Sequence, residues 1–281
     1  MIEVENLGFT YPHADNPTLQ NVNFAIKKGE VFGLLGPSGA GKSTAQRVMM
    51  RLLTGHTGTV KMFGKPIEQL GRDLYNKIGV SFELPALYLR LTARENLKLF
   101  AALYDRPTIS IEKCLELVDL LEDADKRVES FSKGMKMRLN LCRSLLHEPD
   151  ILFFDEPTSG QDPARARITR DLIKSLKAQG KTIFLTTHNM AEADEVCDKI
   201  GFLHNGTIVK QGAPAVLKQQ FGTRSLKVTT GLEKMDNVYD FPMENIGRNQ
   251  DFLELMHNDN ILSLHTQEAS LDDVFIKLVQ N

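Results

Sequence analysis

The sequence has few cysteines, no long apolar run and almost no net charge. Its three cysteines, Cys114, Cys142 and Cys197, are scattered along the chain and have no CxxC spacing. That pattern indicates buried thiols in a reducing compartment and argues against a disulfide framework or a metal site. No apolar stretch approaches the length of a bilayer-spanning helix, and residues 1–5 have neither a basic region nor an apolar core. We therefore expect neither a membrane span nor secretion.

The charge balance limits the partners of the chain. Its 34 Lys and Arg residues oppose 36 Asp and Glu residues, which gives a formal net charge of −2. A protein that coats a nucleic acid normally carries a strong basic excess, so we expect no nucleic-acid partner. The basic residues between positions 165 and 177 are better explained as the solvated face of a helix.

The pattern along the chain predicts an α/β fold. Residues 2–29 alternate apolar and polar positions, as in antiparallel strands, whereas residues 31–35 are continuously apolar, as in a core strand. Strand patterns return at residues 151–154 and 182–185, on either side of a helical stretch at residues 164–178. This order predicts βαβ units and a mostly parallel sheet.

Two further segments have a different character. Residues 74–121 show a helical pattern, which predicts a helical insert whose apolar face contains Leu97, Phe100, Ala101 and Tyr104. From about Phe221 the sequence pattern predicts a small α+β appendage. Its last segment is predicted to be a helix, because the apolar residues there have helical spacing. A length of 281 residues suits one large domain with such an appendage.

A glycine-rich segment follows the strand predicted at residues 31–35 and precedes helix formers from Ala45 onward. Its glycines allow successive N–H groups to point inward at phosphate oxygens. Lys42 adds a point charge toward the β- and γ-phosphates, the Ser43 hydroxyl can ligate Mg²⁺, and a helix N-terminus favours anions. The predicted nucleotide-binding loop consists of Gly36, Pro37, Ser38, Gly39, Ala40, Gly41, Lys42, Ser43 and Thr44.

Three further residues follow core strands of the predicted sheet. Asp155 and Glu156 end the strand at residues 151–154, and His188 follows the strand that begins at Thr182. Because parallel strands present their carboxyl ends at one edge, these side chains are expected beside the same phosphates. Asp155 is predicted to hold Mg²⁺ and Glu156 to accept a proton from the attacking water. His188 is predicted to donate a hydrogen bond to the γ-phosphate.

With the segment Phe131-Ser132-Lys133-Gly134-Met135-Lys136, these motifs make the chain resemble the ATP-binding subunit of an ABC transporter over about residues 1–218. The resemblance implies a P-loop NTPase core with an N-terminal antiparallel part. It divides the chain into an ATP-binding domain at residues 1–220, with a helical insert at about residues 84–147, and an accessory subdomain at residues 221–281.

The resemblance also implies a dimer. Ser132 and the N–H of Gly134 would bind the γ-phosphate held by a second ATP-binding subunit, so that two subunits close head to tail around two ATP molecules. The pair could be a homodimer or a heterodimer. Taken alone, a serine before an apolar helical pattern is also a helix cap.

Two other positions match the family pattern. Tyr11 corresponds to the aromatic residue that stacks on adenine, although a tyrosine on a strand face is the structural alternative. Asp162 corresponds to a residue in the loop that crosses the dimer interface. An aspartate there also suits a helix N-cap, and the two roles are compatible.

Two positions depart from the family pattern. Glu83 replaces the usual glutamine after the strand that precedes the helical insert, and its carboxylate still offers an oxygen to Mg²⁺. It also adds negative charge near the γ-phosphate. Lys133 replaces the usual second glycine of the Ser132 segment, and its side chain is expected to point outward.

The resemblance implies an ATPase, with ATP as substrate and Mg²⁺ as cofactor, that powers a membrane transporter. A separate multispanning permease would form the translocation path, and the chain would work at the cytoplasmic face of the cell membrane. The appendage is similar to that of antibiotic- and multidrug-exporter subunits. Apolar residues at 84–104 would either receive the permease or pack inside the domain. Two alternatives remain: a permease-independent regulatory ATPase, and a hydrolysis-poor partner in a heterodimer.

Overall fold

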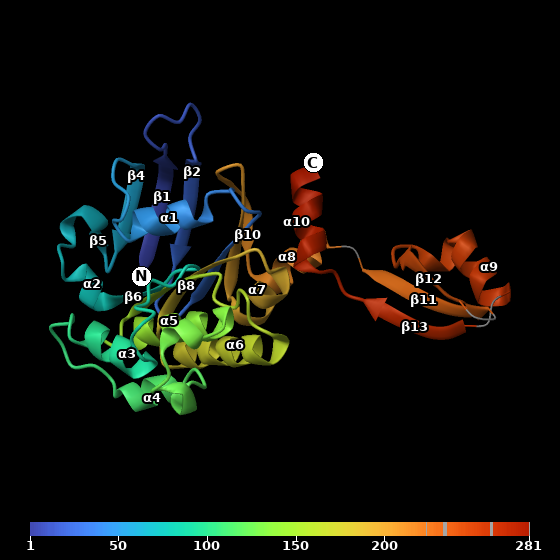
Figure 1. The fold of residues 1–281 in the computed structure, drawn as a ribbon. Coiled ribbons are helices and arrows are strands. Elements are labelled where there is room, and N and C mark those ends of the chain that lie inside the picture. The colour runs from blue at the N-terminus through green and yellow to red at the C-terminus, as the bar shows by residue number, and fades with distance from the viewer. Residues whose placement is uncertain (223, 233–234, 259–260, 281) are drawn as a thin grey trace. The chain divides into compact units, whose positions relative to one another are not determined.

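The computed structural model describes residues 1–222, 224–232, 235–258 and 261–280, which form two compact units (Figure 1). The first unit contains residues 1–212 and the second residues 213–281. This division lies slightly before the boundary expected after residue 220. Helix α8 (Pro214–Phe221) falls in the second unit, where it packs against α10 (Leu271–Gln280).

The first unit begins with an antiparallel sheet whose strand order is β2-β1-β4-β5. Its strands are β1 (Ile2–Phe9), β2 (Leu19–Ile26), β4 (Thr57–Met62) and β5 (Lys65–Pro66). Buried and exposed residues alternate along most of β1, because one face of the sheet lies on the core. The predicted N-terminal antiparallel part is confirmed.

A six-stranded sheet with the order β10-β9-β3-β8-β7-β6 forms the centre of the first unit. Its strands are β3 (Val31–Leu35), β6 (Ile78–Ser81), β7 (Ile151–Asp155), β8 (Thr182–Thr187), β9 (Lys199–His204) and β10 (Thr207–Gly212). All pairs are parallel except β9 with β10. The predicted mostly parallel sheet is therefore confirmed, and the segments after β3, β6, β7 and β8 meet at one edge.

Helices occupy the connections between these strands (Figure 1). They are α1 (Lys42–Met49), α2 (Leu74–Lys77), α3 (Ala93–Ala101), α4 (Ile111–Glu116), α5 (Lys133–Leu145), α6 (Pro163–Ala178) and α7 (Met190–Val196). Short 3₁₀ turns are η1 (Ile67–Gln69), η2 (Leu121–Asp123) and η3 (Val128–Ser130). None of the helices formed by the described residues combines the length and apolar character needed to cross a bilayer.

The helical pattern predicted over residues 74–121 is interrupted by β6 and is shorter than expected at α3. Tyr104 lies beyond the end of α3, where its ring stacks on the imidazole of His147 with centroids 3.9 Å apart. Tyr104 therefore packs from the loop that follows α3. Its apolar side chain keeps the helical spacing in the sequence, but it is not part of the helical face.

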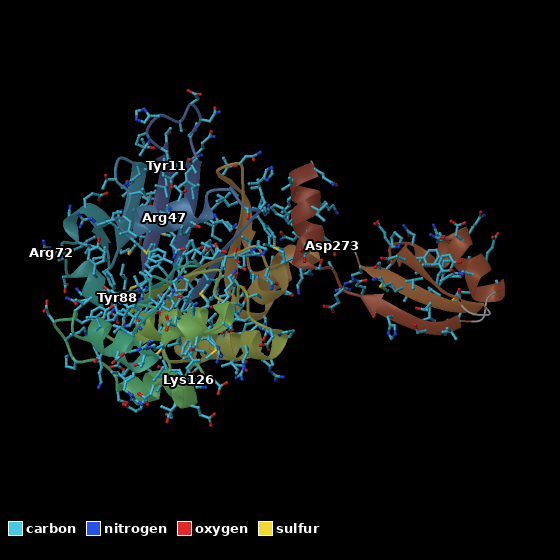
Figure 2. The ribbon with its side chains drawn as sticks, viewed as in Figure 1. Tyr11, Arg47, Arg72, Tyr88, Lys126 and Asp273 are labelled. Carbon is cyan, nitrogen blue, oxygen red and sulfur yellow. The ribbon has the colours of Figure 1, made fainter. Side chains whose placement is uncertain are left out.

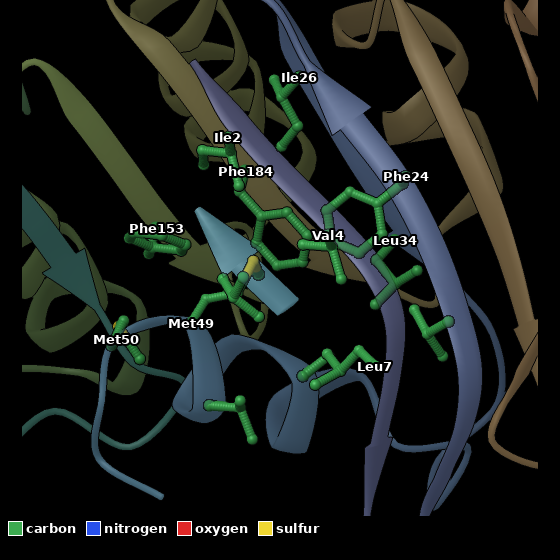
Figure 3. Close-up of a cluster of buried hydrophobic side chains, with 14 of the residues drawn as sticks. Ile2, Val4, Leu7, Phe24, Ile26, Leu34, Met49, Met50, Phe153 and Phe184 are labelled. Carbon is green, nitrogen blue, oxygen red and sulfur yellow. The ribbon is translucent and has the colours of Figure 1, made fainter. Parts of the chain in front are cut away.

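Helix α1 packs between the two sheets of the first unit. Met49 of α1 lies in one buried cluster with Ile2 and Val4 of β1 and with Phe153 and Phe184 of the central sheet (Figure 3). Each fully buried apolar side chain contributes roughly 1.5–3 kcal/mol to folding. This packing fixes the helix that follows the glycine-rich loop, and so fixes the loop itself.

The opposite face of the central sheet carries α5 and α6. Leu139, Cys142 and Leu146 pack in one cluster with Leu152 and Phe154 of β7. All three cysteines of the chain are free thiols, and Cys197 is only partly buried.

The predicted solvated basic face of α6 is partly ion-paired. Lys174 lies 2.6 Å from Glu195, and Lys177 lies 2.5 Å from Asp198.

The second unit contains a three-stranded antiparallel sheet with the order β12-β11-β13. Its other elements are β11 (Ser225–Leu232), β12 (Met235–Pro242), β13 (Ile261–Gln267), α9 (Gln250–Asn258) and the 3₁₀ turn η4 (Ile246–Arg248), in addition to α8 and α10, which pack on each other. Val228, Phe241 and Leu255 form its small core, which joins α9 to the sheet. This is the small α+β appendage that the sequence predicts.

Candidate nucleotide-binding site

The loop between β3 and α1 makes two close backbone approaches that exclude side chains. A Cβ on Gly36 would lie 2.1 Å from the carbonyl oxygen of Leu203. Gly41, the residue before α1, has a φ of 109°, and a Cβ there would lie 2.9 Å from the oxygen of Thr18. The loop therefore requires glycine at both positions, and its curvature follows from the sequence.

Lys42 is the buried cation of this loop, with 8% of its surface exposed. Its Nζ donates hydrogen bonds to the carbonyl oxygens of Gly36 at 2.7 Å and Pro37 at 3.0 Å. Burial lowers the pKa of Lys42, while the carboxylates of Glu156, Asp155 and Glu83 oppose that shift. The side chain thus provides positive charge between the loop backbone and three acidic residues.

Ser43 and Asp155 meet across the loop and the end of β7. The Ser43 hydroxyl lies 3.2 Å from Oδ2 and 3.4 Å from Oδ1 of Asp155, within hydrogen-bonding distance. The Thr186 hydroxyl of β8 donates a hydrogen bond to Oδ1 of the same carboxylate. Two neighbouring strands and the first turn of α1 therefore hold a hydroxyl and a carboxylate in contact.

Glu156 and His188 form the second pair. Glu156 lies at the end of β7 with a φ of 49°, in the left-handed region that side chains rarely adopt. Its Oε1 accepts hydrogen bonds from the backbone N–H of His188 at 3.1 Å and from Nδ1 at 2.8 Å. Its Oε2 lies 3.2 Å from the Thr187 hydroxyl, which donates to it. Oε2 accepts fewer hydrogen bonds than Oε1 and can still accept a proton from a water molecule.

A pocket of about 400 Å³ brings most of the predicted residues together. Its lining consists of Thr18, Ser38, Gly39, Gly41, Lys42, Ser43, Thr44, Glu83, Asp155 and Glu156. Glu83 reaches this pocket because it follows β6, the strand beside β7. The described residues contain no group of three or more His, Cys, Asp or Glu side chains able to hold a metal ion by themselves.

Ser132, Gly134 and Asp162 lie in a separate pocket of about 230 Å³. Ser132 caps α5 by accepting a hydrogen bond from the N–H of Met135, and Asp162 caps α6 in the same way with Arg165. The two pockets have no lining residue in common. One chain therefore does not bring Ser132 and Gly134 to the pocket that contains Lys42.

The side chain of Lys133 packs against the turn before α6 of the same subunit. A Cβ on Gly160 would be 2.7 Å from Cδ of Lys133, and Nζ lies 3.4 Å from the Ser159 hydroxyl. The side chain is exposed, as expected, but it covers the turn before α6. A shorter side chain at position 133 would leave that turn uncovered.

Tyr11 lies just after β1 and is partly buried (Figure 2). Its hydroxyl is 3.2 Å from Oγ1 of Thr44, and its ring makes an edge contact with Phe9 at a centroid distance of 5.0 Å. The tyrosine is thus attached to the phosphate-binding loop through Thr44, whereas it is not among the residues that line the pocket.

Several residues that organise the site are not among those predicted from the sequence. Thr186 and Thr187 hydrogen-bond to Asp155 and Glu156, and Glu192 contacts Thr187 from α7. The sequence does show two consecutive threonines directly before His188, at the end of a predicted strand. Because adjacent strand residues point to opposite faces, this pair indicates hydroxyl groups on both sides of the strand end. Glu192 gave no such signal, since its position matches an ordinary first-turn helix acid.

Comparison with known proteins identifies the family. The family model described as ABC transporter matches residues 19–159, about half of the chain. The chain belongs to the ABC transporter family. It is 44% identical to the fluoroquinolones export ATP-binding protein of Mycobacterium tuberculosis, over 99% of this chain and 93% of that protein. It is 32% identical to the bacitracin transport ATP-binding protein BcrA of Enterococcus faecalis, over 99% of this chain and 96% of that protein.

Solved structures of ABC transporter subunits share the fold. An ATP-binding subunit of an ABC transporter superposes with a TM-score of 0.70 at 30% identity, over 79% of this chain and 93% of that chain. A dimeric ATP-binding cassette in a post-hydrolysis state, bound to ADP and Pi, gives a TM-score of 0.70 at 28% identity, over 76% of this chain and 98% of that chain. The P-loop NTPase fold expected from the sequence is thereby confirmed.

Proposed function

We propose that this chain is the ATP-hydrolysing subunit that powers a membrane exporter of drug- or antibiotic-like compounds. The observation that carries the proposal is the convergence of a buried cation, a hydroxyl and three carboxylates in one pocket. The names of the relatives, which export fluoroquinolones or transport bacitracin, support the class of cargo.

The residues of the pocket fit Mg²⁺ with a nucleotide. Mg²⁺ prefers hard oxygen ligands and is usually held by one or two carboxylates together with substrate phosphates. Ser43 and Asp155 supply a hydroxyl and a carboxylate in contact, and Glu83 lines the same pocket. When bound, the ion would neutralise phosphate charge. Ser43, Asp155 and Glu83 would hold the ion together with phosphate oxygens of the nucleotide. A site completed by phosphates does not need three or more protein ligands of the His, Cys, Asp or Glu type, and the described residues contain no such group.

The hydrolytic step is assigned to Glu156. Its Oε2 would accept a proton from the attacking water, while His188 holds Oε1 through two hydrogen bonds. Lys42, together with the backbone of residues 36–44, would bind the phosphates. If Nδ1 of His188 donates to Glu156, Nε2 can donate to the γ-phosphate only when the imidazole is protonated.

The second pocket supports a head-to-tail dimer. Ser132 and Gly134 line a space apart from the pocket of Lys42, so their predicted contact with a γ-phosphate requires a second subunit. Asp162 lies in the same space as Ser132 and is assigned to the dimer interface. A related cassette has been solved as a dimer.

The surface of the helical insert supports a permease partner. Large apolar side chains are exposed between β6 and α4, among them Leu84, Tyr88, Leu89, Leu99 and Leu103 (Tyr88 is labelled in Figure 2). We assign these residues to the contact with a multispanning permease. The subunit would then work at the cytoplasmic face of the membrane without a membrane span of its own.

Copurification tests the transport assignment. The tagged chain is expressed in its own host, membranes are solubilised in detergent, and the complex is analysed for stoichiometry. The proposal expects a multispanning protein in fixed ratio, lost from a Leu84→Asp/Leu103→Asp variant but retained by a control variant with Leu262→Asp in the second unit. Stoichiometric ribosomes or DNA in place of a multispanning protein would contradict it and support a permease-independent ATPase.

The purified chain also distinguishes an active subunit from a hydrolysis-poor partner. Glu83 favours this second candidate, because it adds a carboxylate to the pocket in which phosphate charge has to be neutralised. Turnover by the chain alone supports an active subunit. Tight ATP binding without turnover, with activity restored only by a different ATP-binding subunit, would support the heterodimeric alternative.

A further inference from the structure

The hydroxyl of Thr187 has three hydrogen-bonding partners. The N–H of Asn189 donates to Oγ1 at 3.0 Å, Oε2 of Glu156 lies at 3.2 Å, and Oε2 of Glu192 lies at 3.0 Å. Glu192 comes from α7, whereas Glu156 directly follows β7. A single threonine at the end of β8 therefore connects a buried acid with the predicted general base.

The number of protons at this hydroxyl limits how the three partners can bind. A hydroxyl has one proton to donate, and an ionised carboxylate can only accept. If both Glu156 and Glu192 were ionised, one of their oxygens would face the lone pairs of Thr187 without a proton between them. The arrangement is satisfied only when one of the two acids is neutral and donates its own proton to Thr187.

Burial and hydrogen bonding identify Glu192 as the neutral acid. Glu192 is 2% exposed. Its Oε1 is buried and has no hydrogen bond of ordinary geometry from the described residues, although the Thr158 hydroxyl lies near the carboxyl. An ionised carboxylate with such an oxygen would be strongly unfavourable. Glu156, by contrast, accepts three hydrogen bonds over its two oxygens and lines the open pocket.

The charges around Glu192 agree with this assignment. Burial raises its pKa to about 7, and the nearby carboxylate of Glu156 adds to the rise. The hydroxyls of Thr187 and Thr158 and the positive charge of Arg170 on α6 act in the opposite direction. The thiol of Cys197, whose pKa burial raises well above its usual value, is also near Glu192 and adds no charge.

The local geometry shows that Glu192 is not an ordinary helix cap. Asn189 caps α7 by accepting a hydrogen bond from the N–H of Glu192 at 3.1 Å. In a capping box, the acid at this position would return a hydrogen bond to the N–H of the cap residue. Here the N–H of Asn189 binds Thr187 instead, and the carboxyl of Glu192 binds Thr187 as well.

We propose that Glu192 is a positioning residue for ATP hydrolysis: as a neutral acid it donates to Thr187, which donates to Oε2 of Glu156 and so orients the oxygen that receives the proton of the attacking water. This role rests on the proposed function of Glu156 as general base. Loss of the proton from Glu192 would turn the Thr187 hydroxyl toward Glu192 and leave Oε2 of Glu156 without its donor.

Infrared spectroscopy of the nucleotide-free chain tests the protonation state without relying on hydrolysis. At pH 6 the difference spectrum of wild type minus Glu192→Gln should contain the carbonyl band of a neutral carboxylic acid. As the pH rises toward 9, this band should be replaced by carboxylate bands. A carboxylate in place of the neutral acid at pH 6 would overturn the proposal, even if Glu156 is the general base.

Steady-state ATPase kinetics test the positioning role. In wild type, kcat should decline at alkaline pH as Glu192 ionises. Glu192→Gln keeps a donor of the same size, so it should retain most of the turnover at pH 7 and lose this alkaline decline. Glu192→Met and Thr187→Val each remove a link, so each should lower kcat by about tenfold, the effect of one hydrogen bond. The ATP KM should not change, because neither residue lines the pocket.

Three controls separate positioning from a structural effect. The double variant Glu192→Met/Thr187→Val should be no slower than either single variant, because both break the same chain of hydrogen bonds. Glu116→Gln, which removes an exposed acid from α4 of the same unit, should leave the pH profile unchanged. Circular dichroism should show all variants folded. An unchanged alkaline decline in Glu192→Gln, or additive losses in the double variant, would contradict the proposal.

Discussion

Nδ1 of His188 lies 2.8 Å from Oε1 of Glu156, and the backbone N–H of His188 reaches the same oxygen at 3.1 Å. The histidine therefore holds one oxygen of the predicted base at two points. Since β7 and β8 are neighbours in the parallel sheet, this contact depends on the register of two buried strands. It links the packing of the core to the orientation of a catalytic side chain.

Replacing His188 by alanine should lower turnover by about 10- to 100-fold. The change removes the side-chain hydrogen bond to a charged group, which is worth roughly 1.5–3 kcal/mol. ATP binding, measured with a fluorescent analogue, should remain close to that of wild type. His257→Ala, an exposed histidine on α9, is the matched control and should leave turnover unchanged. Equal turnover in the two variants would contradict the assigned role of His188.

Lys42→Ala should remove most nucleotide affinity, because Lys42 is the only cation among the residues that line the pocket. Calorimetric titration with ATP in the presence of Mg²⁺ measures the loss. Arg47→Ala removes an exposed cation from the same helix (Figure 2) and should bind ATP like wild type. Unchanged affinity in Lys42→Ala would rule out this pocket as the nucleotide site.

Glu83→Gln should shift the activation of ATPase activity to higher Mg²⁺ concentrations. A neutral oxygen binds a hard cation less well than an anionic one. If Glu83 only repels the γ-phosphate, the same change should leave the metal dependence alone and tighten ATP binding. Titrating both proteins with Mg²⁺ distinguishes the two cases, and superimposable curves together with tighter ATP binding would contradict the ligand assignment.

Glu192→Gln should change how stability depends on pH. The pKa of Glu192 is raised in the folded state, from 4.5 to about 7, so this group favours the folded state fully below pH 4.5 and loses that contribution as the pH rises through 7. The loss is roughly 3 kcal/mol, at about 1.4 kcal/mol per tenfold change in proton affinity. Urea unfolding at pH 4.5 and 8 measures it.

The variant cannot ionise at position 192, so its stability should fall less than that of wild type between the two pH values. Glu116→Gln serves again as the exposed control, since it keeps the buried carboxyl of Glu192. Parallel stability curves for wild type and Glu192→Gln would show that the buried acid does not retain its proton near neutral pH.

Much of the phosphate-binding loop could be predicted because its determinants are local. Gly36 and Gly41 accommodate close backbone approaches, and Lys42 follows them directly in the chain. Asp155 and Glu156 could be placed near the loop because parallel strands end at one edge of a sheet. These inferences needed only the order of elements, which hydrophobic patterns convey.

The contacts that organise the site could not be predicted in the same way. Glu192 of α7 meets Glu156, the residue after β7, through Thr187 of β8. The side chain of Lys133 packs closely on Gly160, in the turn before α6, where a Cβ would not fit. Tyr104 continues a helical spacing but stacks on His147 outside the helix. Each of these contacts is set by tertiary packing, for which the sequence has no periodic signal.

Glu156 is proposed as the general base of a composite site closed by two subunits. Glu156→Gln keeps the size of the side chain but cannot accept a proton, so turnover should fall by about 10²- to 10⁴-fold while ATP binding persists. Size-exclusion chromatography of this variant with and without saturating ATP is the most direct measurement. We expect an ATP-bound dimer that dissociates when ATP is removed, and a monomer under both conditions would contradict the composite site.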